Sequence, residues 1–292
     1  MGIVLGPNRY GKAENRLLRV YRDTPRHEIR DLNVSTSLRG DFADAHVTGD
    51  QAKVLPTDTQ KNTVFAFAKE RRVGQIEEFA LTLGRHFVDD IEPVDLARVD
   101  IEEFAWERIE VDGRGHDHSF VRTGPEVRTT AVTVESGAAW VVSGLKDLTV
   151  LKSTGSEFSG FLTDRYTTLP ETWDRVLATS LEVQWRYGRL VVDWAVSYAS
   201  VRAILLSRFA TTRSMALQQS LWEMGRGVLE ERPEVAEIRL SAPNRHHIAV
   251  DLTAFGLENP NEVFHATDRP YGVIRATAVR DDAPPAGPAW DV

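Results

Sequence analysis

Cysteine is absent from the 292-residue sequence, which excludes disulfides, thiolate metal sites, iron–sulfur clusters and a cysteine nucleophile. Long apolar runs are also lacking, since the best, Ala203-Ile204-Leu205-Leu206, is far shorter than the roughly 18 residues of a membrane span. Basic residues are in deficit, with 35 Lys and Arg against 43 Asp and Glu and a formal net charge of −8. A net-acidic chain without a basic tail is a poor candidate for binding nucleic acid or an anionic membrane.

Recognisable targeting signals and nucleotide-binding motifs are lacking too. Residues 1–16 do not combine a basic start with the apolar block of a secretory signal. The final residues, Ala289-Trp290-Asp291-Val292, are not a peroxisomal Ser-Lys-Leu address. There is no Gly-x-Gly-x-x-Gly before a helix, no Walker loop and no Gly-x-Ser-x-Gly elbow. We therefore expect a cytoplasmic protein without a standard nucleotide cofactor.

Several segments predict β-strands through their Val, Ile, Thr and aromatic content and their period-2 patterns. The segment 99–111 alternates with slips at Glu102-Glu103 and before Ile109, and such slips predict bulges in a long strand. The other predicted strands are 16–21, 29–38, 127–134, 139–142, 181–187, 190–209, 238–240 and 248–252.

Four segments predict helices. An apolar stripe at helical spacing is formed by Ile76, Phe79, Ala80, Leu83 and Phe87. A second stripe, from Leu217 to Leu229, follows Ser214, which is placed to cap it. A third helix is predicted from Thr168 by a capping box with a proline just inside it, and a fourth spans 59–69 with Thr57 or Asp58 at its start.

Strands grouped around helices favour an α+β fold with antiparallel sheets over a strictly alternating parallel sheet. The helices fall into two groups, near 59–90 and 168–231, which fits two similar halves, although direct repetition in the sequence is weak. Predicted strands carrying Trp185, Tyr187, Trp194 and Tyr198 leave a sheet face for a partner to cover, which favours a homo-oligomer. The tail after Arg280 is rich in turns, and we expect part of it to be mobile.

No metal signature survives inspection. His116 and His118 are two residues apart beside a glycine-rich turn, but zinc needs a third ligand and supporting hydrogen bonds. The more frequent explanation is a polar loop at the start of a strand. The adjacent His246 and His247 point to opposite faces of a strand and cannot form one site.

Polar clusters at the boundaries of the predicted elements are the more informative feature, because function concentrates in loops held by a rigid scaffold. Each alone is also explained by ordinary turn and capping chemistry. These clusters are NRYGK at 8–12, TDTQKNT at 57–63, LKSTGSEF at 151–158 leading to Gly160-Phe161, and PNRH at 243–246. Two further motifs are YTTL at 166–169 and NEVF at 261–264.

Taken together, these segments resemble the urate oxidase (uricase) family, in the family order, from about Tyr10 to about Ala278. The resemblance implies the tunnelling (T-) fold, with two tandem modules of antiparallel sheet plus helix pair, at residues 1–138 and 139–292. It also implies a homotetramer whose sheets close into a barrel, with active sites at subunit interfaces.

The reaction implied by the resemblance is the oxidation of urate by O₂ and water to 5-hydroxyisourate and H₂O₂, with neither metal nor organic cofactor. Arg175, on the helix predicted from Thr168, is then the clamp for the anion, because its planar fork matches a carbonyl and a ring nitrogen. Gln218 offers a paired donor and acceptor, and Phe158 stacks on the purine. Leu217 acts through its backbone and shape; the family also carries Val there.

The same resemblance places Thr57 and Asp58 in the site from the neighbouring subunit, where N–H groups at a helix start favour an anion. Lys12, Thr57 and His246 form a proton relay in which Lys12 helps the weakly basic Thr hydroxyl. Asn244 positions O₂ or water. Lys12, Arg175 and the helix start are expected to make the site locally positive in spite of the acidic chain.

Two alternatives remain open at this point. One is another purine- or pterin-transforming T-fold enzyme, although zinc-dependent members usually use cysteine and anchor the heterocycle with Glu. The other is a purine-binding or structural tetramer without turnover, against which Lys12, Thr57 and His246 argue.

Overall fold

The computed structural model describes residues 2–267 and 269–291. These residues form two compact units. Unit 1 contains residues 2–144, 189–195 and 284–291, and unit 2 contains residues 145–188, 196–267 and 269–283. The first change of unit therefore falls inside one strand, β5 (Ala138–Lys152). The module boundary at 138/139 stays a prediction.

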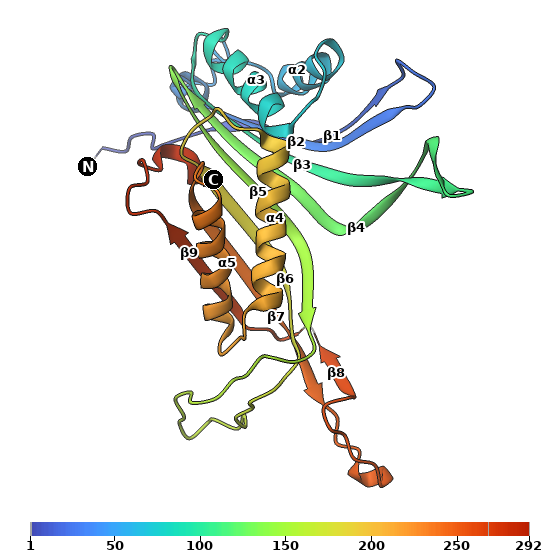
Figure 1. The fold of residues 1–292 in the computed structure, drawn as a ribbon. Coiled ribbons are helices and arrows are strands. Elements are labelled where there is room, and N and C mark those ends of the chain that lie inside the picture. The colour runs from blue at the N-terminus through green and yellow to red at the C-terminus, as the bar shows by residue number, and fades with distance from the viewer. Residues whose placement is uncertain (1, 268, 292) are drawn as a thin grey trace. The chain divides into compact units, whose positions relative to one another are not determined.

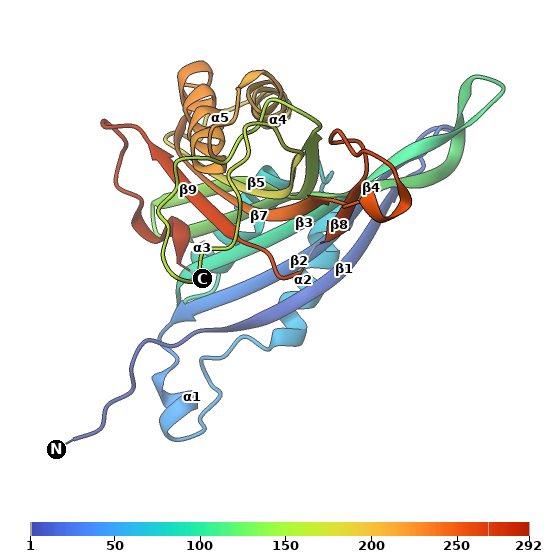
Figure 2. The same ribbon diagram turned by 90° about the horizontal axis from the view of Figure 1, so that it is seen from below.

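Unit 1 is an antiparallel sheet with helices on one face (Figures 1 and 2). Its strands pair in chain order, each with the next. They are β1 (Tyr10–Tyr21), β2 (Glu28–Gly40), β3 (Val94–Val111) and β4 (Arg114–Glu135), and the helices are α1 (Ala43–Val47), α2 (Thr57–Glu70) and α3 (Ile76–Asp89).

Helix α3 confirms the predicted apolar stripe, since Ile76, Leu83 and Phe87 are fully buried. The helix packs on β3 and β4. A Cβ on Gly84 would lie 2.6 Å from a methyl of Val134, so the absence of a side chain there allows the close approach of helix and sheet.

A buried ionic contact joins the same helix to the sheet. Glu77 is 0% exposed and accepts hydrogen bonds from Arg128 Nη2 of β4, at 2.8 Å, and from Ser143 Oγ of β5, at 2.5 Å. A carboxylate so deeply buried requires such partners. Glu103 lies 3.7 Å from the same arginine.

The bulges expected in the long strand are present, although one is displaced. The β3–β4 register shifts between Phe104 and Trp106 and again between Arg108 and Glu110. The β2–β3 pairing runs without interruption through Glu102 and Glu103, so the first slip lies just beyond its predicted position.

Unit 2 has its own antiparallel strands, with two helices lying along one face of the sheet (Figure 1). β7 pairs with β6, and on its other side with β9 through its first part and β8 through its last. The elements are β6 (Leu177–Tyr187), α4 (Trp194–Thr211) apart from its first two residues, α5 (Leu217–Glu231), β7 (Val235–Ala249), a 3-10 helix (Thr253–Phe255), β8 (Phe264–Thr267) and β9 (Val273–Val279).

The strand predicted over 190–209 is wrong, because most of this segment is helix α4. Its apolar and β-branched residues imitate a strand, but the buried positions Ser197, Val201, Ile204 and Leu205 follow helical spacing. Of the four aromatics expected to leave a sheet face open, Trp194 and Tyr198 lie on this helix, whereas Trp185 and Tyr187 lie on strand β6 as predicted but are buried within the single chain. Trp185 is fully buried within unit 2, and its indole N–H donates to the Tyr187 hydroxyl at 2.9 Å.

The helix predicted from Thr168 is also wrong. Residues 168–176 are irregular, and Thr172 pairs with Phe158 through two backbone hydrogen bonds, of 2.7 and 2.9 Å. This long-range pairing replaces the local capping box. The predicted cap of α5 is displaced as well, since the N-cap position is Ala216 rather than Ser214.

The C-terminal tail packs on unit 1 instead of being mobile. A 3-10 helix at Gly287–Trp290 places Ala289, 2% exposed, against Ala131 and Val142. Gly287 has φ +50, and a Cβ there would lie 2.7 Å from the Trp140 ring. The tail is thus held by buried apolar contacts and by the absence of a side chain at Gly287.

Candidate active site

Unit 1 gathers three of the predicted site residues around the start of α2. Thr57 and Asp58 are the first two residues of that helix. Lys12 lies in β1, which contacts the helix. The pKa of the Asp58 carboxyl is lowered, chiefly by its hydrogen bond from Lys61 and by the charge of that lysine, and to a smaller extent by the charge of Lys12. Lys12 is thus close enough to the start of α2 for its charge to act on the Asp58 carboxyl.

Unit 2 gathers most of the others through a junction of three segments. The N–H of Ser214 donates to Gly155 O at 2.9 Å, and the N–H of Glu157 donates back to Ser214 O at 2.8 Å. The N–H of Arg175 donates to Ser156 O at 2.8 Å. Backbone hydrogen bonds therefore fix the segment around residue 156 to the segment before β6 and to the segment before α5.

Arg175 and Phe158 meet at this junction. The guanidinium carbon of Arg175 lies 5.2 Å from the centre of the Phe158 ring, and Nε lies 3.4 Å from Ser156 Oγ. Burial lowers the pKa of the Arg175 guanidinium, which still stays charged. The prediction that Arg175 lies on a helix is wrong. Its segment is irregular, and the backbone hydrogen bond to Ser156 positions it instead.

Phe161 also belongs to this cluster, although the sequence predicted no role for it in the site. Its ring is stacked on that of Phe158, with centroids 4.7 Å apart and planes 17° apart. Stacking behind Phe158 restricts the rotation of that ring and occupies part of its surface. The spacing Phe158-Ser159-Gly160-Phe161 was the available signal, and the φ of +67 at Gly160 makes the intervening turn possible.

Leu217 and Gln218 open α5, three and four residues after Ser214. Leu217 is 4% exposed and packs inward, whereas Gln218 is exposed. Helix α5 is thereby joined to the Phe158–Arg175 pair through the backbone of Ser214.

Asn244 and His246 lie on β7. Asn244 pairs with Thr179 of β6, a strand that begins two residues after Arg175, and its N–H donates to Gly272 O at 2.8 Å. His246 pairs with Thr267 of β8. Lys12 and Thr57 belong to unit 1, so the predicted relay to His246 joins residues of different units and stays a prediction.

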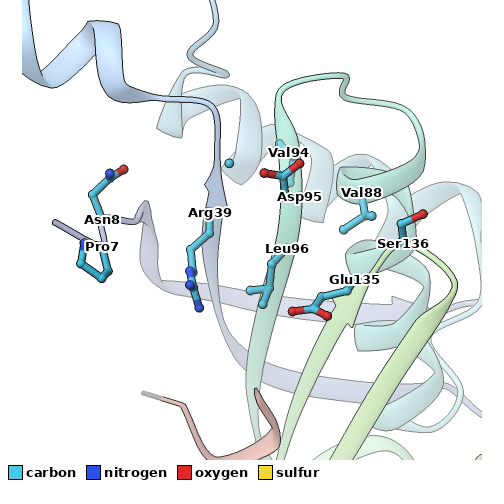
Figure 3. A pocket seen from close by; sticks show the side chains of 10 residues that line it. Pro7, Asn8, Arg39, Val88, Val94, Asp95, Leu96, Glu135 and Ser136 are labelled. Atoms are coloured by element: carbon cyan, nitrogen blue, oxygen red, sulfur yellow. The ribbon is translucent and has the colours of Figure 1, made fainter. Parts of the chain in front are cut away.

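A cavity of about 550 Å³ in unit 1 contains none of the predicted site residues. Figure 3 shows Arg39, Asp95 and Glu135 among its lining residues. Two carboxylates against one guanidinium make this cavity unfavourable for an anion.

No group of three or more His, Asp or Glu side chains in residues 2–267 and 269–291 is arranged to hold a metal ion. The rings of His116 and His118 lie 4.5 Å apart, edge to face. No helix in the same described residues is long and apolar enough to cross a membrane.

Comparison with known proteins gives the activity. The family model described as uricase matches residues 8–133 and 141–275. The chain is 53% identical to the uricase of Arthrobacter globiformis over 288 residues, which are 99% of this chain and 94% of that one. It is 36% identical to the uricase of Dictyostelium discoideum over 276 residues, 94% of this chain and 96% of that one.

Solved structures agree. The crystal structure of uricase from Arthrobacter globiformis matches with a TM-score of 0.95 at 52% identity, covering 99% of each chain. A crystal structure of a uricase from Bacillus fastidious matches with a TM-score of 0.83 at 25% identity, covering 96% of each chain.

The class defined by these matches is an oxidoreductase that acts on urate. Within that class, the chain belongs to the uricase family. Its reaction is the oxidation of urate by O₂ and water to 5-hydroxyisourate and H₂O₂. The alternatives of a binding protein without turnover and of a different purine or pterin enzyme are not favoured.

Proposed function

We propose that this chain oxidises urate in a homotetrameric T-fold barrel, with each active site shared between two subunits. The observation that carries the proposal is the separation of the predicted residues into two ordered clusters. Unit 1 holds Lys12 beside Thr57 and Asp58, and unit 2 holds the Phe158–Arg175 pair. Each unit combines an antiparallel sheet with helices, which supports the proposal of two modules at 1–138 and 139–292.

Exposed apolar side chains support a subunit interface. The loop between Phe158 and β6 carries several that are largely open to solvent in the single chain, among them Leu162 at 96% and Tyr166 at 71%. Such a concentration of exposed apolar surface is typical of a protein–protein contact. Within the described residues of unit 1, β1 pairs only with β2, which leaves a strand edge for another chain.

In the proposed site, unit 2 binds the purine. Urate stacks on Phe158, Arg175 donates a bidentate fork to a carbonyl and a ring nitrogen, and Gln218 pairs with another edge. Leu217 shapes the pocket through its backbone and side chain. The start of α2 in the neighbouring subunit adds Thr57 and Asp58, with backbone N–H groups that favour the anion.

Lys12, Thr57 and His246 form the proposed catalytic relay. Urate gives two electrons to O₂, which takes up two protons to become H₂O₂, and water supplies the hydroxyl that is added to the purine. The relay accepts and passes the protons released by urate and water, while Asn244 positions O₂ or water. All electrons in this scheme come from urate and all are taken by O₂, so the proposal includes no cofactor.

Complementation between two inactive variants tests the shared site. Lys12→Met damages only the unit 1 cluster, and Arg175→Ala damages only the unit 2 cluster. A symmetric pair that contains one subunit of each variant has two shared sites. One of them combines the intact unit 1 cluster of the Arg175→Ala subunit with the intact unit 2 cluster of the Lys12→Met subunit. Random assembly of co-expressed variants should therefore restore about a quarter of the parent turnover.

No restoration, in mixed oligomers shown by differential tagging to contain both variants, would contradict the shared site. Lys12→Met alone should bind urate without turning it over, since Arg175 and Phe158 are intact. A parent-like turnover of Lys12→Met would contradict the role of the lysine. A cytoplasmic location belongs to the same proposal and is tested by fractionation of the source cells.

A further inference from the structure

Gln60 lies one turn into α2 and is 0% exposed. Its Oε1 accepts a hydrogen bond of 2.8 Å from Thr36 Oγ1 of β2, a hydroxyl that is itself buried. Its Nε2 lies 3.5 Å from Leu55 O, in the turn that leads into the helix. A buried amide thus connects the first turn of α2 to the sheet and to the preceding loop.

The strand residue at the other end of this connection is the register partner of Lys12. Thr36 is opposite Lys12 in the β1–β2 ladder, and the ladder is irregular from Lys12 to Asn15. The strands come unusually close just before this point, because a Cβ on Gly11 would lie 1.8 Å from Thr36 O. A displacement of Thr36 would therefore be transmitted directly to the backbone of Gly11, which precedes Lys12.

The helix residue at the near end of the connection is three positions after Thr57. The first turn of α2 has no side-chain cap at its N-terminus. Asp58 contacts only its own helix among the hydrogen bonds that it forms, with Lys61 and with Asn62. The Gln60–Thr36 hydrogen bond is a direct side-chain connection between this turn and the strand paired with Lys12.

We propose that Gln60 and Thr36 are positioning residues for the reaction, which hold Thr57 and Asp58 at a fixed distance and angle from Lys12. This inference rests on the proposed roles of Lys12 and Thr57. Polar groups at these positions cost more to bury than apolar side chains of equal size unless their hydrogen bond is made. A directional bond defines one orientation of the helix start, which apolar packing alone defines less strictly.

Paired substitutions of Thr36 test the proposal. Thr36→Val keeps the shape and removes the hydroxyl, whereas Thr36→Ser keeps the hydroxyl. Because small displacements of reacting groups are costly, Thr36→Val should lower kcat about tenfold, and Thr36→Ser should stay within about twofold of the parent. KM for urate should change less than kcat, since Phe158, Arg175 and Gln218 of unit 2 keep their contacts with urate and only the contribution of the α2 start is disturbed.

Thr130→Val is the matched control in the same unit. Thr130 is 2% exposed and donates to Val142 O at 3.1 Å, so this change also removes one buried hydroxyl. It should lower the melting temperature without lowering kcat. Equal effects of Thr36→Val and Thr130→Val on kcat would reduce the role of Thr36 to general stability and overturn the proposal.

Gln60→Met breaks the same hydrogen bond from the helix side and keeps the test valid if Thr36→Val does not fold. It should lower kcat to a similar extent, and the double variant should be no slower than either single one, since both remove one shared interaction. If the decreases in kcat of the two single variants multiplied in the double variant, the shared Gln60–Thr36 hydrogen bond would not explain them. Lys12→Met distinguishes a failure of the proposed function from a failure of the positioning role. If Lys12→Met keeps full turnover, the proposed function fails. If it is inactive while Thr36→Val is not impaired, only the positioning role fails.

Discussion

Replacement of Arg175 by Lys tests the binding half of the site most sharply, because it keeps the positive charge and removes the planar fork. The guanidinium is half-buried and lies over the Phe158 ring, and its Nε lies 3.4 Å from Ser156 Oγ, while the backbone N–H of Arg175 donates to Ser156 O. An ammonium offers a point charge on a flexible stem and cannot make two parallel hydrogen bonds to one edge of a purine.

The expected loss follows from the hydrogen bonds exchanged. The fork makes two charge-assisted hydrogen bonds to urate and the ammonium makes one, so about one bond worth roughly 1.5–3 kcal/mol is lost. This corresponds to a decrease of roughly 10- to 150-fold in kcat/KM. Most of it should be a higher KM, since the bond is present both in the bound substrate and in the transition state.

Initial rates of urate loss over a range of urate concentrations measure both constants. Arg226→Lys is the matched control, because Arg226 is an exposed arginine of α5 whose ion pair with Glu223, at 2.6 Å, lies on the helix surface. Such a pair contributes little, so the control should match the parent. A kcat/KM for Arg175→Lys within threefold of the parent would refute the bidentate clamp.

Three further predictions concern stability. Glu77→Gln leaves Arg128 in a buried site with a weaker partner and should lower the free energy of unfolding by about 3 kcal/mol, measured by urea titration; no change would contradict the buried ion pair. The pKa of Glu234 is lowered: burial raises it, but hydrogen bonds from its own backbone, Ser197 and Arg232 outweigh burial. Since a lowered native pKa stabilises above the unfolded value and is lost as pH falls, the parent should lose more stability between about pH 5 and pH 3 than Glu234→Gln does. Gly287→Ala should cost about 1–3 kcal/mol, and more than Gly49→Ala, which has φ +80 and open space around its Cβ; equal melting temperatures would show that the ring contact is unimportant.

The sequence predicts well those elements whose pattern is local. Helix α3 carries a single apolar stripe, and all of its predicted positions are buried. Helix α4 was missed because apolar and β-branched residues occur on most of its sides, which hides the helical period. The buried face is recognised in the structure by Ser197, Val201, Ile204 and Leu205, which follow helical spacing.

The site shows the same division between local and long-range causes. Thr57 and Asp58 were predicted at a helix start, and α2 begins at Thr57, although the N-cap position is Pro56 and neither side chain caps the helix. The location of Arg175 was not predictable, because it depends on a backbone hydrogen bond and a side-chain contact to Ser156, 19 residues away, which no local rule predicts. Nothing in the sequence distinguishes Gln60 apart from its place in the TDTQKNT motif. Its role follows from a hydrogen bond to Thr36, which lies on a strand and precedes it by 24 residues.

The most direct test of the account is turnover by chelator-treated protein incubated with urate in air. Urate is followed by its ultraviolet absorbance, oxygen by an electrode and peroxide by a coupled assay. The account predicts that urate and O₂ disappear in equal amounts while H₂O₂ appears in the same amount, with no added metal or cofactor. Urate that persists, that is lost without consumption of O₂, or that is lost only after a metal or cofactor is restored would contradict it.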